Sequence, residues 1–164
     1  MGGWQALWRR FGGRKENAGG ETPWRFPHSR ALIECLQGDH SDLLEQYSAI
    51  ERLCTSGQYA AIPEALGHFK ARFDLHILNE DENFYGFLEE TYAERPLELS
   101  RVKSFRAEMN AIARGVVQFV RKYQYDILRP KGANQFLLDL HTMGALLLRR
   151  VRAEEEQLYP LYQP

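Results

Sequence analysis

The stretch His76-Ile-Leu-Asn-Glu80-Asp-Glu-Asn-Phe84-Tyr85 returns later in the chain as Arg150-Val-Arg-Ala-Glu154-Glu-Glu-Gln-Leu158-Tyr159. The two copies share a glutamate, an acidic run and a tyrosine in register, but Arg150 stands where the first copy has His76. A histidine and a glutamate spaced i, i+4 lie on one helix face and can bind a metal ion together. An arginine cannot be a ligand, because its guanidinium stays protonated and only donates hydrogen bonds. The repeat therefore indicates a bundle of two related halves, of which the second is altered.

Four amphipathic helices are predicted from apolar residues that recur at helical spacing. They cover about residues 30–56, 62–90, 97–125 and 135–159. Gly57 suits the position after a helix end, and Pro63 is tolerated in a first turn. No segment shows a convincing alternation typical of a strand. Long helices joined by short connections predict an all-α, up-down-up-down four-helix bundle over residues 30–164.

The composition is that of an ordinary soluble globular protein. The chain has 164 residues, 44% of them hydrophobic and 26% charged, with a formal net charge of -1. This length favours one domain, and the small net charge argues against nucleic acid as a partner. Cys35 and Cys54 would lie about 28 Å apart along one predicted helix, too far for a disulfide. With no apolar run long enough for a bilayer and no signal-peptide core, we expect a cytoplasmic protein.

Residues 1–29 form an extension of different character. Trp4, Leu7, Trp8 and Phe11 recur at helical spacing beside two arginines, and a stretch rich in glycine and charge follows. The favoured interpretation is a tail that packs loosely on its own domain or lacks fixed structure. The alternative is that the short apolar face forms a helix that docks on a protein partner or on a membrane surface.

Polar side chains on the apolar stripes are the candidate functional residues, because buried polar groups need partners. His40 lies on the stripe of the first predicted helix, and His76 and Glu80 lie on that of the second. Arg150 and Glu154 lie on the stripe of the fourth. A single core histidine is more often hydrogen-bonded than metal-bound. Two histidines and two glutamates that converge, however, need a cation, which is either a metal ion or Arg150.

The remaining histidines are weaker candidates. His141 is out of phase with Arg150 along the fourth helix and should face away from the site. His68 is expected at the surface, and His28 precedes the first helix. Glu108 borders the stripe of the third helix, so an inward reach is the alternative to a surface position.

The pattern resembles a known family. Asp39-His40-Ser-Asp-Leu43, His76-x-x-x-Glu80 with Phe84-Tyr85, and Glu154-Glu155 with Leu158-Tyr159-Pro160 are similar to the motifs of bacterial hemerythrin-like, or HHE cation-binding, domains. The resemblance runs from about residue 30 to the C-terminus. It implies a four-helix bundle that holds a pair of non-haem irons. Members of that family bind or sense O₂, other oxidants or NO, store iron, or assist iron–sulfur repair.

By this resemblance, His40, His76, Glu80 and Glu154 are the metal ligands. Two ligand positions depart from the family, because Arg150 replaces one histidine and the third helix, near Met109, has none. Both losses fall in the same half, so a normal di-iron site is not expected. The guanidinium of Arg150 can bridge Glu80 and Glu154, and the thioether of Met109 is a poor partner for iron.

Three functions follow from this pattern. The first is a site for a single metal ion, iron or else zinc, that senses redox state or a small gas. The second is a metal-free, degenerate bundle that acts as a protein-interaction or regulatory module through its surface. Catalysis ranks last, and we expect no enzyme, because no nucleophile or oxidant-activating group accompanies the site.

Overall fold

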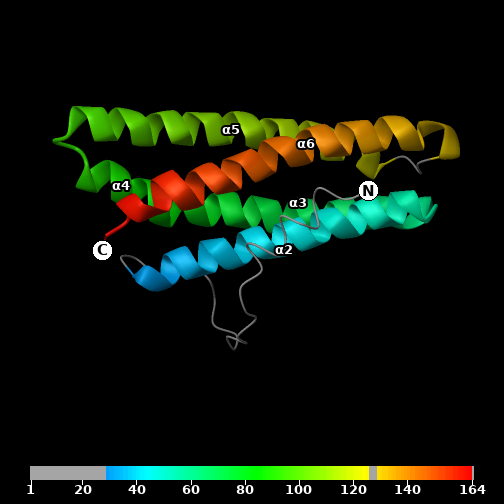
Figure 1. Ribbon diagram of the computed structural model, residues 1–164, viewed down its shortest axis with the longest axis horizontal. Helices are drawn as coiled ribbons and strands as arrows, with labels where there is room; N and C mark the ends of the chain where they lie inside the picture. The colour runs from blue at the N-terminus through cyan, green and yellow to red at the C-terminus, as the bar shows by residue number, and fades with distance from the viewer. Residues whose placement is uncertain (1–28, 126–128, 164) are drawn as a thin grey trace.

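The computed structural model describes residues 29–125 and 129–163, which form four long helical segments (Figure 1). These segments are α2 (Arg30–Thr55); α3 (Ile62–Asn79) with η2 (Glu80–Tyr85) and α4 (Gly86–Thr91); α5 (Pro96–Gln124); and α6 (Ala133–Ala153) with η4 (Glu154–Leu158) and η5 (Tyr159–Leu161). Short 3-10 turns, η1 (Tyr59–Ala61) and η3 (Pro130–Gly132), precede α3 and α6. Helix α2 packs on α3 and α6, and α5 packs on the same two helices. The predicted all-α bundle is confirmed.

The predicted helix ends agree with the observed ones apart from small shifts. Ser29 caps α2 by accepting a hydrogen bond from the backbone N–H of Ala31 at 3.2 Å. Gly57 follows α2 with a φ of 74°, a conformation that strains any residue with a side chain. Pro63 and Pro96 lie in the first turns of α3 and α5, where the missing N–H would have no helical partner. The predicted docking residues Trp4, Leu7, Trp8 and Phe11, with His28, lie outside the described residues.

Both copies of the repeated stretch depart from the regular α-helix that the sequence predicted. Each widens into a π-helical turn, η2 beginning at Glu80 and η4 beginning at Glu154. A π-helix bonds residue i to residue i+5, which brings residues five apart onto nearly the same face. Tyr85 and Tyr159 follow the two glutamates at this spacing, and all four side chains are buried. The wider turn therefore lets each copy direct both a carboxylate and a phenol inward.

The interior holds two apolar clusters that meet at a polar layer. The large core contains Leu43, Tyr47, Ile50, Cys54, Ile62, Leu66, Phe69, Phe73, Met109, Val116, Phe119, Val120, Ala133, Phe136, Leu140 and Met143. The small core contains Leu32, Leu36, Phe84, Tyr85, Leu88, Val102, Leu158, Tyr159 and Tyr162. Along α2, His40 lies between Leu36 of the small core and Leu43 of the large core. The predicted polar residues thus form a cross-section through an otherwise apolar interior.

Cys35 and Cys54 are both free thiols, as their separation along α2 requires. None of the helices in the described part of the chain combines the length and the apolar character needed to cross a membrane.

Candidate metal centre

The four predicted ligands lie in this buried layer. His40 belongs to α2 and His76 to the last turn of α3, while Glu80 and Glu154 open the turns η2 and η4. None of the four is more than 3% exposed, so each needs a buried partner or a cation. The prediction that these residues face the core is confirmed.

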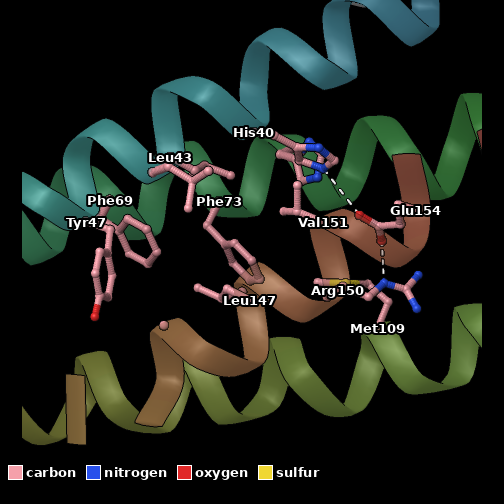
Figure 2. A pocket seen from close by; sticks show the side chains of 13 residues that line it. His40, Leu43, Tyr47, Phe69, Phe73, Met109, Leu147, Arg150, Val151 and Glu154 are labelled. Atoms are coloured by element: carbon pink, nitrogen blue, oxygen red, sulfur yellow. Dashed lines mark hydrogen bonds and ion pairs between the residues drawn. The ribbon is translucent and has the colours of Figure 1, made fainter. Parts of the chain in front are cut away.

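Three of these side chains converge closely enough to share a metal ion. One ligand atom from each of His40, His76 and Glu154 lies within 4.8 Å of the other two. His40 Nε2 is 3.2 Å from Glu154 Oε2, and the two imidazole rings meet edge to face with centroids 4.8 Å apart. Figure 2 shows His40 and Glu154 pointing toward one another from facing helices. Two imidazoles and a carboxylate form a donor set that suits Fe(II) or Zn(II).

Glu80 lies beside this group rather than within it. Its Oε1 accepts a hydrogen bond from the hydroxyl of Tyr159 at 3.3 Å, whereas its Oε2 is buried without a hydrogen-bond partner. A buried carboxylate oxygen without a partner is costly, and a bound cation is one way to satisfy it. The donor set of the layer therefore fits a metal ion, with Glu80 placed to complete it.

Two further carboxylates hold the imidazole rings from outside. His40 Nδ1 donates to Glu155 Oε1 at 2.8 Å, and His76 Nδ1 lies 3.5 Å from Asp39 Oδ2. Arg72 in turn donates to Asp39 at 2.7 Å. Such outer carboxylates fix the ring orientation and leave the other nitrogen free for a metal. The sequence prediction assigned Asp39 and Glu155 no role, although each is the chain neighbour of a predicted ligand.

Burial and close pairing set the charges of the layer. Burial by itself would lower the pKa of His40, but hydrogen bonds to Glu154 and Glu155 outweigh it and raise that pKa to about 9. Burial and the charge of Glu154 raise the pKa of Glu80 to about 8. For Glu154, burial opposes ionisation, but His40 and Arg150 outweigh it and lower the pKa. At neutral pH the metal-free layer thus holds a protonated His40, so a metal ion must displace protons to bind.

Arg150 fills the other half of the layer. Its Nε donates to Glu154, and its Nη2 donates to the hydroxyl of Tyr85. The guanidinium carbon lies 5.1 Å from the centroid of the Phe105 ring, within the range of a cation–π contact. Figure 2 shows Arg150 on the far side of Glu154 from His40, so the carboxylate lies between two cationic groups.

The predicted bridge from Arg150 to Glu80 is wrong. Among the described residues, the hydrogen bonds of Arg150 go to Glu154 and Tyr85, and Arg150 acts on Glu80 through charge alone. Glu108 lies at the surface with its side chain 56% exposed, and its Oε2 lies 3.5 Å from Arg150 Nη1 at the edge of the layer.

Among the residues that the structure describes, the half beside Arg150 lacks the imidazole donors of the other half. Met109 is buried on α5 and lines the same cavity as Arg150, where the resemblance placed a histidine. A thioether is a soft donor, and a guanidinium repels a cation brought close to it. The donors that could hold a metal ion therefore lie beside His40 and His76, whereas the side of Arg150 offers a soft donor and a fixed cation.

A small cavity of about 30 Å³ adjoins the layer. Its wall is mostly apolar, and it also includes His40, His76, Arg150 and Glu154 (Figure 2). A volume of this size holds about one or two water-sized molecules. The cavity thus gives a diatomic-sized molecule space directly beside the candidate ligands.

The weaker histidine candidates behave as expected. His141 is exposed on α6 and pairs with Glu51, and His68 is exposed on α3. Neither belongs to the group of converging ligand atoms.

Comparison with known proteins agrees with this geometry. The family model described as the hemerythrin HHE cation binding domain matches residues 31–162, which covers all four helical segments. No curated protein and no solved structure gave a significant match to the chain. The model spans most of the sequence, and the converging histidines and glutamate could hold the cation that defines the family. The chain is therefore a member of the hemerythrin HHE cation-binding domain family.

Proposed function

We propose that this protein binds a single metal ion through His40, His76, Glu80 and Glu154. The observation that carries the proposal is the convergence of His40, His76 and Glu154 within 4.8 Å, in a buried layer. Arg150 supports one ion rather than two, because its guanidinium takes the place beside Glu154 where a second ion would need ligands. The family's usual pair of irons is thus reduced to one.

Iron is the metal that we propose. Two imidazoles with carboxylates suit Fe(II), although zinc accepts the same donors. The role that we propose is sensing or regulation, not catalysis and not the carriage of O₂ at a di-iron site. The apolar cavity of about 30 Å³ beside the ligands supports this role, since a small gas or oxidant would reach the ion there.

A metal-free regulatory bundle is the second candidate, and one observation favours it. Glu154 already has two cationic partners, His40 and Arg150, so part of the layer is neutralised without any metal. In that case the output of the domain would depend on its surface.

Metal analysis of folded protein from iron-supplemented cells distinguishes the two candidates. We expect about one iron per chain in the wild type and a loss of most of it in His76→Ala, which removes one of two imidazoles. His68→Ala is the matched control, because it removes an exposed histidine from the same helix.

Wild-type protein that is folded and metal-free after anaerobic incubation with Fe(II) would contradict the metal site and favour the metal-free bundle. Two irons per chain would contradict the role given to Arg150.

A further inference from the structure

The hydroxyl of Tyr159 lies among the proposed ligand atoms. It is 3.3 Å from His40 Nε2, and it donates a hydrogen bond to Glu80 Oε1 at 3.3 Å. The ring lies nearly parallel to that of His40, with centroids 5.8 Å apart, and Phe84 packs against it edge-on with centroids 5.1 Å apart. Tyr159 is only 4% exposed, so its oxygen is held inside the layer.

The repeated stretch gives Tyr159 a counterpart in Tyr85. Each tyrosine follows its glutamate by one π-helical turn, and each reaches across to the other copy of the repeat. The oxygen of Tyr85 accepts a hydrogen bond from Arg150 of the second copy. The oxygen of Tyr159 meets Glu80 of the first copy and His40. The oxygen of Tyr85 therefore faces a cation that belongs to the protein itself, the guanidinium of Arg150.

We propose that Tyr159 is a further oxygen ligand of the bound metal ion, beside His40, His76, Glu80 and Glu154. The inference rests on the proposed metal site and adds a ligand to it. The tyrosine oxygen that meets Arg150 in one half has its counterpart in the oxygen of Tyr159, which meets the proposed ligands His40 and Glu80 in the other. A phenolate is an anionic oxygen donor, which tyrosine also supplies to iron in some haem proteins.

The local contacts agree with this assignment. Tyr85 is not an equivalent candidate, because its oxygen is already bonded to Arg150. The phenolic proton leaves to solvent when the phenolate forms, because Glu80, which now accepts the hydrogen bond of Tyr159, is itself a proposed ligand and must be ionised to bind the metal ion. Phe84 and His40 both pack against the ring, so its position beside the proposed ligands is fixed by these contacts.

The test is the visible spectrum of the full chain loaded with iron and oxidised to Fe(III). We expect a phenolate-to-iron charge-transfer band in the wild type, its loss in Tyr159→Phe and its retention in Tyr85→Phe. The last variant is the matched control, because it removes the same hydroxyl from the equivalent place in the repeat. Iron affinity should fall about tenfold or more in Tyr159→Phe and less in Tyr85→Phe.

Resonance Raman spectra of wild-type protein test the same point without a substitution. Excitation within the band should enhance phenolate vibrations, and these should shift in protein made with ring-deuterated tyrosine. A loaded wild type without these vibrations, or a band that survives in Tyr159→Phe, would overturn the ligand role and leave the metal site standing. A wild type that takes up no iron would overturn both.

Discussion

The half of the layer built by α2 and α3 differs from the half built by α5 and α6 in the kind of cation it can hold. The first presents His40 and His76, two imidazoles that suit an exchangeable metal ion once His40 has released its proton. The second presents Met109 and Arg150, of which one is a poor ligand and the other is itself a cation. Glu154 belongs to both, with Oε2 toward His40 and Oε1 toward Arg150.

Buried carboxylates thus require positive charge, which a side chain can supply as well as a metal ion. Arg150 supplies one fixed charge with two directed hydrogen bonds, to Glu154 and Tyr85. Glu80 receives neither bond, and its Oε2 has no hydrogen-bond partner. With a pKa of about 8 it holds a proton at neutral pH, and a metal ion on the side of the histidines would take the place of that proton.

The largest effect should come from restoring the missing imidazoles. Met109→His combined with Arg150→His removes the fixed cation and supplies two neutral donors, so the metal content should rise from about one ion per chain to about two. Metal analysis and the spectrum of the iron-loaded protein measure this gain. Met109→Leu with Arg150→Met is the control, which removes the cation without adding donors. A double-histidine variant that stays at one ion would contradict the placement of the second half-site.

Removing the fixed cation alone should strongly destabilise the metal-free protein. Arg150→Met leaves Glu154 with His40 as its only close cationic partner in the layer. Breaking a buried ion pair from one side costs about 3–5 kcal/mol of unfolding free energy. Urea unfolding of the metal-free protein measures it, and Arg149→Met, at the exposed neighbouring position, should change it by less than about 0.5 kcal/mol. Equal stability of the two variants would show that the guanidinium is not needed for charge balance.

A smaller effect is expected from the carboxylate that holds His40 in the metal-binding half. Glu155→Leu removes the acceptor of His40 Nδ1, which frees the ring to turn, so metal affinity should fall about 10–100-fold. Competition with a chromophoric chelator measures the affinity. Glu156→Leu changes the exposed neighbour and should leave the affinity unaltered. Similar losses in both variants would indicate a general effect of charge rather than orientation of the imidazole.

The smallest effect should come from a histidine outside both halves. His141→Ala removes an exposed pair with Glu51, and such surface pairs contribute about 1 kcal/mol or less. Metal content should not change. A loss of metal in this variant would show that His141 is itself a ligand.

Much of the site could be predicted from the sequence because the helices are long and amphipathic. His40, for example, shares the stripe of Leu36 and Leu43, and helical spacing alone requires it to face inward. Helical spacing likewise predicts that Arg150 faces inward, because it shares the stripe of Leu147. The partners of Arg150 could not be predicted, because a flexible guanidinium has several acceptors in reach and only packing selects Tyr85 over Glu80.

The four helices, their inward faces and the unequal pair of half-sites follow from the amino-acid sequence, since all three depend on spacing within one helix and on residue type. Which groups meet across helices depends instead on the packing of the bundle. The π-helical turns at Glu80 and Glu154 change the direction of every side chain after them, and local spacing gives no signal for that change. They bring Tyr159 to His40 and Tyr85 to Arg150, contacts that depend on the packing of distant segments.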